Sequence, residues 1–257
     1  MISDVVDPAR ANALAVTLGL SERFATGDAL PPFFHQIYFW EPQPEAALGR
    51  DGHPRTGTGL IPDMGLPRRM WAGGRLEFLA PFRAGVAADK VSSIDTTTRK
   101  DGRSGPLAFV TLRHEISQDG TLSIREFQDL VYREDPSPDA PAPATRAAPA
   151  DEQGEEVAVT TTTLFRYSAL TFNGHRIHYD LDYARDVERY PGLVTHGPLI
   201  AQLLMLKAAR ELGALERFSF RAASPLAHFE GLTLCRSGQA LWARGPDGRV
   251  VMEAEAG

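Results

Sequence analysis

The sequence predicts an α+β fold of two halves, in each of which a curled antiparallel sheet is wrapped around a helix. Two observations lead to this fold: apolar strands joined by tight turns on both sides of a proline-rich segment, and one long uncharged helix in the second half. The 257 residues are enough for two domains of about 120 residues each. Hydrophobic residues at 43% and charged residues at 23% are typical of a globular protein, which excludes a disordered, collagen-like or coiled-coil chain.

The strands are indicated by alternation and by turn residues. Leu76, Phe78 and Phe82 alternate with charged residues, as in a half-buried strand. Two apolar runs, 107–116 and 121–132, flank an Asp-Gly pair, which is a strong hairpin signal. In the second half we expect strands at 157–165 and 226–234 and a hairpin over 241–254.

The helix is predicted over 198–212, with Gly197 before it as a cap and Gly213 after it. For nine residues after Pro198 it carries no charge on any face, so it should be buried nearly all round. A long antiparallel sheet curled around one buried helix is the hotdog architecture, and two such halves make a double hotdog. The corresponding helix of the first half is ambiguous; 30–40 is apolar enough but contains two prolines.

The domain boundary is predicted at a segment over 136–156, which has five prolines and no large apolar side chain. Such a segment cannot join a core and is expected to be a linker or long surface loop. The chain therefore divides into an N-terminal hotdog over 1–135, the acidic linker over 136–156, and a C-terminal hotdog over 157–257 that carries the polar motifs.

The charge distribution narrows the choice of partners. The net charge is −6, and five acids against Arg146 place most of it in the linker, so no basic face is left for a nucleic acid. The longest uncharged apolar run, 193–206, is too short to cross a membrane. The single Cys235 excludes an internal disulfide and a cysteine-based zinc site. No secretory signal is recognisable, so we expect a cytoplasmic protein.

The densest polar cluster lies over 167–180 and reads YSALTFNGHRIHYD. Two histidines three residues apart, between a strand and a buried helix, suggest a functional segment. The alternative is purely structural: Asn173 would form a turn, Asp180 would cap a short helix, and the histidines would be surface residues.

A second feature, Val-Thr-His-Gly-Pro over 194–198, immediately precedes the buried helix. A helix N-terminus presents unpaired amide donors and a positive dipole end, which suit an oxygen that gains negative charge. The structural alternative is that glycine and proline simply start the helix.

Together these features resemble the MaoC-like hydratase and dehydratase family. Its loop motif is Asp-x-Asn-Pro-x-His, and here Asn173, His175, Arg176 and His178 occupy the Asp, Asn, Pro and catalytic His positions. A His-Gly pair, His196 and Gly197, follows at the helix start, as in that family. The layout is most similar to the double-hotdog branch of mesaconyl-C4-CoA and itaconyl-CoA hydratases and hydroxyacyl-thioester dehydratases. The resemblance includes the segment LPRRMWAGGRLEF at 66–78. It implies that the N-terminal half is a degenerate hotdog of the FAS1-like dehydratase type.

The resemblance implies an enoyl-thioester hydro-lyase that uses no metal or redox cofactor. His178, with a pKa near 6.5, would exchange protons; the Gly197 amide would receive the thioester oxygen. Asn173 departs from the family's Asp: it cannot act as a base, but it can position a water molecule or orient His178. His175 is the less favoured acid/base, in a supporting position, and it and His196 are expected at the substrate.

Substrate choice depends on cations. A short dicarboxylic acyl-CoA needs one for its free carboxylate, and Arg166 and Arg176 flank the motif. A simple enoyl-CoA or 3-hydroxyacyl-carrier-protein thioester is the alternative substrate.

Two other functions are possible for a hotdog protein. A hotdog thioesterase would place a carboxylate near the helix start, where 194–199 has none. A non-catalytic acyl-thioester binding module is favoured by the loss of the Asp and disfavoured by the retained His178. A homodimer is also expected.

Overall fold

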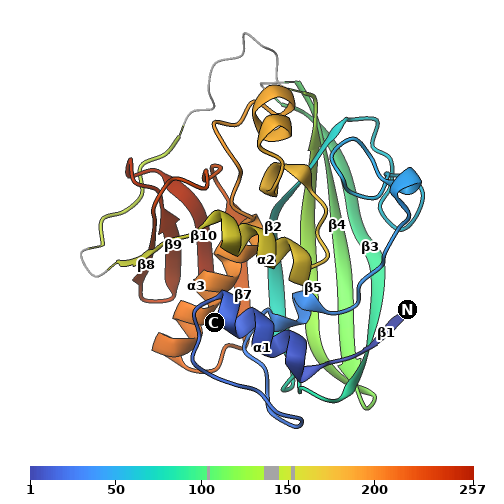
Figure 1. Cartoon of the computed structure of the whole chain (residues 1–257), viewed down its shortest axis with the longest axis vertical. Helices are drawn as coiled ribbons and strands as arrows, with labels where there is room; N and C mark the ends of the chain where they lie inside the picture. The colour runs from blue at the N-terminus through green and yellow to red at the C-terminus, as the bar shows by residue number, and fades with distance from the viewer. Residues whose placement is uncertain (103–104, 136–144, 152–153) are drawn as a thin grey trace.

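A computed structural model describes residues 1–102, 105–135, 145–151 and 154–257 (Figure 1). The strands are β1 (Ile2–Val5), β2 (Arg68–Phe78), β3 (Ala87–Gly102), β4 (Gly105–Gln118), β5 (Thr121–Arg133), β6 (Glu155–Val157), β7 (Arg217–Ala222), β8 (Leu232–Ser237), β9 (Ala240–Arg244) and β10 (Val250–Ala256). The α-helices are α1 (Pro8–Thr17), α2 (Thr161–Leu170) and α3 (Gly197–Leu212). Short helical turns cover Phe34–Ile37, Glu45–Ala47 and Arg176–His178, and a π-helical turn covers Tyr183–Val187.

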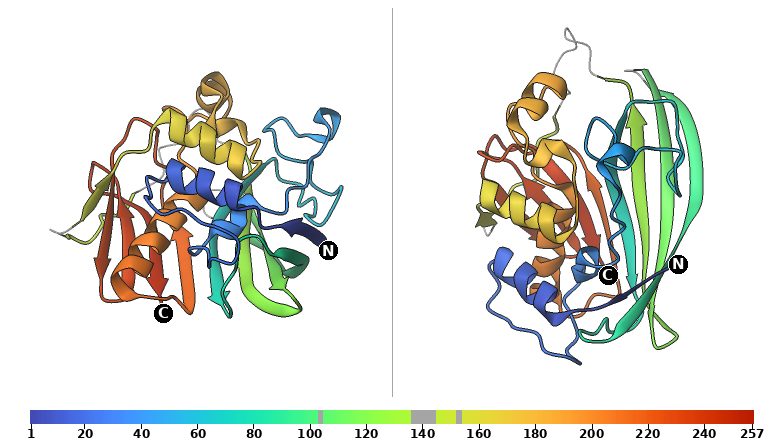
Figure 2. Two further views of the ribbon diagram at one scale, coloured as in Figure 1. Left: turned by 60° about the horizontal axis from the view of Figure 1, so that its bottom comes forward. Right: turned by 45° about the vertical axis from the view of Figure 1, so that its right-hand side comes forward.

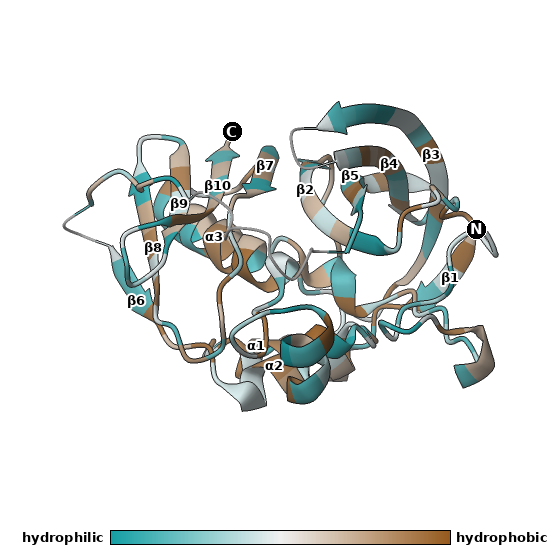
Figure 3. Cartoon of the chain, turned by 90° about the horizontal axis from the view of Figure 1, so that it is seen from above, coloured by the Kyte–Doolittle hydropathy of each residue, from teal (hydrophilic) through white to brown (hydrophobic). Residues whose placement is uncertain are grey.

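The strands of the described residues form one antiparallel sheet in the order β1-β3-β4-β5-β2-β7-β10-β9-β8-β6. The two predicted hairpins, β4–β5 and β9–β10, are confirmed. Figure 3 shows two curls side by side, with β2–β5 in one and α3 inside the other. The fold is the predicted α+β double hotdog, and its two halves share a continuous sheet through the pairing of β2 with β7.

Two glycines allow the two halves to meet closely. Gly73 and Gly74 of β2 pair with Arg221 and Phe220 of β7. A Cβ at Gly73 would lie 2.5 Å from the carbonyl oxygen of Phe220 across the junction, and one at Gly74 would lie 3.1 Å from the ring of Phe220 and 2.7 Å from the carbonyl oxygen of Phe127 on β5 of its own half. Because real Cβ atoms do not approach backbone so closely, the Gly-Gly pair of the RMWAGG sequence is required at the junction.

Helix α3 confirms the helix predicted for the C-terminal half, but its N-cap is His196 and not Gly197. It begins at Gly197, with His196 as N-cap, and ends before Gly213, which has φ +93°. Leu199, Leu204 and Met205 are almost completely buried in the main hydrophobic core. None of the described helices, α3 included, has the length and apolar composition needed to cross a membrane.

Among its described residues, the N-terminal half has no α-helix inside its curl, contrary to the expectation of one helix in each half. The ambiguous segment 30–40 forms only the 3-10 turn Phe34–Ile37. Phe33 and Phe39, on either side of it, have φ +71° and +61°, which interrupts a regular helix. Bulky apolar side chains fill the space instead: Phe33, Phe34 and Ile37 are fully buried.

Residues 157–165 correct a second expectation. The strand predicted there ends at Val157, and Thr161–Leu170 form the helix α2. The threonines suggested β structure, but the side chain of Thr160 accepts a hydrogen bond from the amide of Thr163 and caps a helix. Buried Leu164, Tyr167 and Ser168 then lie on one face of α2, which packs against α1 (Figure 2).

The predicted linker is only partly separate from the body. Its residues 136–144 and 152–153 lie outside the described residues. The described remainder joins the C-terminal sheet: β6 pairs with β8, and Ala147 bridges Arg249. Asp151 also accepts the backbone amide of Arg236 at 2.9 Å. Backbone hydrogen bonds need no apolar side chain, so the absence of large apolar residues did not keep this segment off the sheet.

Candidate active site

The polar segment after α2 is folded by its own side chains. The Asn173 side-chain oxygen accepts the backbone N–H of His175 at 3.0 Å, and the Asn173 N–H donates to Ser168 O at 2.8 Å. Asp180 Oδ1 accepts the N–H of Tyr183 at 3.0 Å, so the predicted cap is confirmed. The oxygen of Asn173 is therefore occupied in a turn, and its Nδ2 donors are the part that can reach a water molecule.

His178 is buried at the centre of this segment. Only 6% of it is exposed, and its Nδ1 lies 2.7 Å from the carbonyl oxygen of Val194. A carbonyl can only accept, so Nδ1 carries the proton and the neutral ring has its lone pair on Nε2. Burial lowers the pKa of His178 to about 3, so the expectation of a pKa near 6.5 is wrong. At neutral pH the side chain is an uncharged base.

The ring of His196 packs on the ring of His178. The two rings stack with centroids 3.6 Å apart and planes 20° from parallel. His196 is fully buried, and its Nε2 lies 2.8 Å from Ser168 Oγ on α2. Burial lowers its pKa well below the usual value, and the pair therefore stacks as two neutral imidazoles. In this position His196 packs against the base.

Gly197 is the first residue of α3, next to the stacked pair. The amide of a first-turn residue has no acceptor within its own helix and points out of the helix end. A Cβ at Gly197 would meet no atom outside the helix and its flanking residues closer than Trp71 O at 3.9 Å, so the space beside its Cα is open. The predicted oxyanion donor and the predicted base therefore lie at the same end of α3.

The two predicted cations are differently placed. Arg166 is exposed on α2. Arg176 donates from Nη2 to Asp180 at 2.7 Å and lies over the Tyr183 ring at 4.3 Å. Its charge is already paired with a carboxylate, which makes it a structural residue of the loop.

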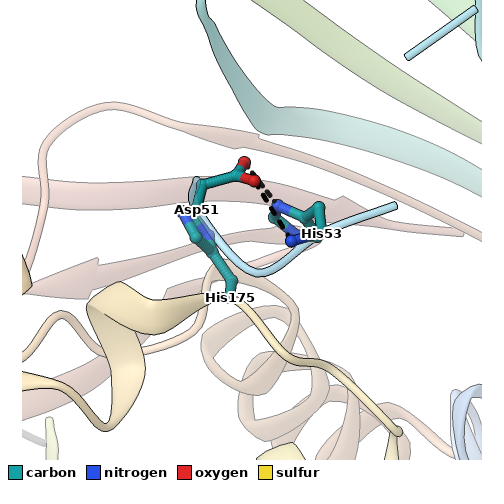
Figure 4. A group of neighbouring side chains, drawn as sticks. All are labelled: Asp51, His53 and His175. Atoms are coloured by element: carbon teal, nitrogen blue, oxygen red, sulfur yellow. Dashed lines mark hydrogen bonds and ion pairs between the residues drawn. The ribbon is translucent and has the colours of Figure 1, made fainter. Parts of the chain in front are cut away.

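Sequence reasoning missed two residues, Asp51 and His53, which come from the N-terminal half (Figure 4). The His53 ring lies against that of His175, with centroids 4.3 Å apart, and the His175 ring meets that of His178 edge-on at 5.2 Å. His53 Nδ1 lies 2.9 Å from Asp51 Oδ2. The only local signal was two titratable residues around a glycine in Asp-Gly-His-Pro, and the sheet topology that brings them here is not readable from sequence.

The charges in this cluster are set by burial and by each other. Burial, then the neighbouring His53 and His178, lowers the pKa of His175 to about 2, so His175 is neutral. Burial raises the pKa of Asp51, but its hydrogen bond to His53 and the charge of that ring lower it more, to about 2. Asp51 is therefore a carboxylate at neutral pH.

Asp51, His53 and His175 also have the donor set of a divalent metal site. One ligand atom from each lies within 4.8 Å of the others. Two observations disfavour a cation: Asp51 already accepts the His53 Nδ1 proton, and the charge of Arg69 also acts on His175. The arrangement is instead a carboxylate hydrogen-bonded to one imidazole, His53, whose ring packs on that of His175.

Comparison with known proteins identifies the relatives. The family model for hydroxyacyl-thioester dehydratase type 2 matches residues 33–228. Mesaconyl-C(4)-CoA hydratase from Chloroflexus aurantiacus is 44% identical, over 98% of this chain and 92% of that protein. A MaoC-like dehydratase from Phytophthora capsici covers 100% of this chain and 94% of its own, with a TM-score of 0.70 and 14% identity. A Mycobacterium tuberculosis protein described as having a double hotdog fold matches 99% of this chain and 92% of its own. Its TM-score is 0.57 and its identity 13%.

Proposed function

Because the chain belongs to the hydroxyacyl-thioester dehydratase type 2 family, we propose that it catalyses the reversible hydration of a short dicarboxylic enoyl-CoA such as mesaconyl-C4-CoA or itaconyl-CoA. The family makes the chain a hydro-lyase that acts on acyl thioesters. The observation that carries the choice of substrate is the 44% identity over nearly the whole chain to a mesaconyl-C(4)-CoA hydratase. A cytoplasmic location and a homodimer remain predictions.

The geometry of His178 supports a role as the general base. Nδ1 is fixed on Val194 O, so Nε2 is free to take a proton from water as the water oxygen bonds to C3 of the acyl group. The Nδ2 donors of Asn173 would hold the water by its oxygen. His175 and His196 are neutral and enclose His178 on two sides, which keeps the base in one orientation.

Gly197 would stabilise the charge that develops in this step. Electrons of the C2–C3 double bond move onto the thioester oxygen, which becomes an enolate, and the amide at the start of α3 donates to it. A proton must then reach C2. In the simplest sequence the protonated His178 returns to C2 the proton it took from water, so that one water molecule is added in all.

The free carboxylate of the proposed substrate needs a cation other than Arg176, which is paired with Asp180. Arg69 on β2 acts electrostatically on His175 and, within the described part of the chain, forms no ion pair with a carboxylate. Its neighbour Arg68 is buried and paired with Glu188 at 2.7 Å. Arg69 is therefore the stronger candidate, ahead of the exposed Arg166.

A second candidate function is dehydration of a 3-hydroxyacyl thioester, including one on an acyl carrier protein, because the matching family model carries that description. Two esters separate the possibilities: mesaconyl-C4-CoA, which carries a second carboxylate, and the uncharged crotonyl-CoA. Loss of the absorbance of the conjugated thioester reports hydration. Faster turnover of the charged ester supports the proposal, and faster turnover of crotonyl-CoA favours the second candidate. Release of free CoA without hydration would indicate a thioesterase and contradict both.

A further inference from the structure

The loop over 49–53 of the N-terminal half is built into the active site of the C-terminal half. The carbonyl of Asp51 accepts the backbone N–H of Arg176 at 2.9 Å, and the carbonyl of Arg50 accepts from the guanidinium of Arg176 at 3.2 Å. Gly52 has φ +85°, and a Cβ there would lie 2.0 Å from Gly174 O. Only glycine permits so close an approach in that conformation, so the position of this loop against 174–176 is specified by the sequence of both halves.

Asp51 fixes the orientation and the tautomer of His53. Asp51 Oδ2 accepts the Nδ1–H of His53 at 2.9 Å, while Oδ1 accepts the backbone N–H of His53 at 3.1 Å. Because a carboxylate only accepts, His53 Nδ1 is the protonated nitrogen and Nε2 is the atom that exchanges protons. A carboxylate that holds one imidazole nitrogen in this way stabilises the imidazolium form when the other nitrogen takes up a proton.

The position of His53 relates it to His178. The His53 ring packs on that of His175, which in turn meets His178 edge-on. The charge of His53 also lowers the pKa of His178, after the larger effect of burial, so the two histidines interact electrostatically. About a quarter of the His53 side chain is exposed, against 6% of His178, so His53 lies on the open side of the cluster.

The chemistry leaves a role for a second group. The addition of water needs a base for the water and an acid for C2, and the buried His178 has one exchangeable nitrogen. The amide of Asn173 neither takes nor gives a proton, although its position matches a carboxylate in the resembling family. From the N-terminal half, the fold brings the carboxylate of Asp51 and the imidazole of His53 against His175 of this loop.

We propose that His53 is a second catalytic acid/base residue, with Asp51 as its positioning residue, so that each half of the protein contributes one proton-transfer group to a single active site. This inference rests on the proposed hydration. Nε2 of His178 takes a proton from water as the water oxygen bonds to C3, and Nε2–H of the imidazolium of His53 gives its proton to C2. His178 then releases its proton to solvent and His53 takes one up, so that the sum is one water molecule added.

The test asks whether Asn173→Asp restores the turnover that His53→Gln removes. Turnover of crotonyl-CoA is measured for the parent, His53→Gln, Asn173→Asp and the double variant, with kcat and KM determined separately. We expect His53→Gln to lower kcat by about 100-fold with little change in KM. Because Asn173→Asp restores the carboxylate found at this position in the resembling family, the double variant should recover at least about tenfold of that loss. Glu45→Gln, an exposed change in the same N-terminal loop region, is the matched control and should leave kcat unchanged.

The outcomes separate the two proposals. If the parent hydrates neither crotonyl-CoA nor mesaconyl-C4-CoA, the proposed function fails and this inference fails with it. If the parent is active and a folded His53→Gln keeps its kcat, or if Asn173→Asp does not rescue it, only the role of His53 is wrong. Asp51→Asn carries the same test should His53→Gln not fold. Loss of activity on dialysis against EDTA, restored by Zn²⁺, would overturn the proposal in favour of a metal site.

Discussion

The two halves of the molecule solve the same packing problem in different ways. The C-terminal sheet, with strands of up to seven residues, curls around α3, whose N-cap residue His196 stacks on the buried His178. The N-terminal sheet has strands of up to sixteen residues and encloses one short turn and a group of aromatic side chains. A hotdog half without its helix has no helix end to bind a thioester oxygen, and here that half contributes a loop to its neighbour's site.

The buried polar groups differ in the same way. In the N-terminal half, His35 Nε2 lies 3.0 Å from Glu126 Oε2, and both side chains are 2% exposed. Burial raises the pKa of Glu126, but the hydrogen bond and charge of His35 lower it more, to about 2, so this is a paired charge. In the C-terminal half, His178 and His196 are neutral and hydrogen-bond to uncharged groups, the carbonyl of Val194 and the hydroxyl of Ser168. We therefore expect the first pair to determine stability and the second to determine turnover.

Glu126→Ala should have the largest effect, on stability alone. It removes one partner of a buried pair, which costs about 3 kcal/mol of unfolding free energy or more, because the remaining polar groups stay buried. Denaturant titration measures it. Glu115→Ala, which breaks a partly exposed ion pair with Arg125 on the neighbouring strand, is the control and should cost less than about 1 kcal/mol. Equal costs for the two changes would refute the contrast.

His178→Ala should act on turnover instead. Removal of the base should lower kcat for the preferred ester by at least about 100-fold, while the far-ultraviolet circular dichroism remains that of the parent. His175→Ala should lower it less, because His175 makes no proton transfer in the proposed reaction. Near-normal turnover in a folded His178→Ala protein would show that the base lies elsewhere.

Acid should destabilise both halves over the same range. Burial lowers the pKa of His178 to about 3 and that of His114 to about 4. Such a histidine binds more protons when unfolded, so the free energy of unfolding falls as the pH drops below about 6.5 and levels off near the folded-state pKa.

Each such histidine contributes a slope of about 1.4 kcal/mol per pH unit within that window. Urea unfolding at pH 7, 6 and 5 measures the total change of the unfolding free energy with pH. His114→Gln should reduce this slope by the contribution of one histidine. A stability that stays constant from pH 7 to pH 5 would contradict the buried neutral state of these rings.

Asn173→Asp should produce the smallest effect and the most selective one. The new carboxylate repels the free carboxylate of a dicarboxylic ester, so kcat/KM for mesaconyl-C4-CoA should fall several-fold relative to that for crotonyl-CoA. It should also raise the pKa of His178 and move the acid limb of the pH-rate profile upward. Equal effects on both esters would remove a main physical reason for the dicarboxylic substrate.

Local signals predicted much of the C-terminal half. Helix α3 is marked by a proline, a following glycine and an uncharged stretch, and the hairpins by Asp-Gly pairs, all of which act over a few residues. Thr161–Leu170 was misinterpreted because a threonine cap and a β-favouring composition look alike without the packing of Leu164 and Tyr167. Helix α1 and the polar strand β3 were not predicted at all; much of β3 is exposed, so its sequence carries little alternation.

The site was predictable only as far as its own segment. Asn173, His178 and Gly197 are close in sequence and resembled a known motif, and the structure brings His178 to the end of α3 that Gly197 begins. Asp51 and His53 reach the site through long-range contacts with Arg176 and His175, which no local pattern encodes. The depressed pKa of His178 likewise follows from burial by distant residues, so an ordinary value was expected from the sequence.

The central claim, that the two halves act together in one reaction, is tested most directly by a double-mutant cycle of His53→Gln and His178→Ala. Groups that work as a unit are strongly non-additive, since loss of either already disables the shared step. We predict that kcat of the double variant on mesaconyl-C4-CoA equals that of His178→Ala alone within a few-fold. A double variant whose loss equals the product of the two single losses would show that the halves act independently, and would contradict the shared active site.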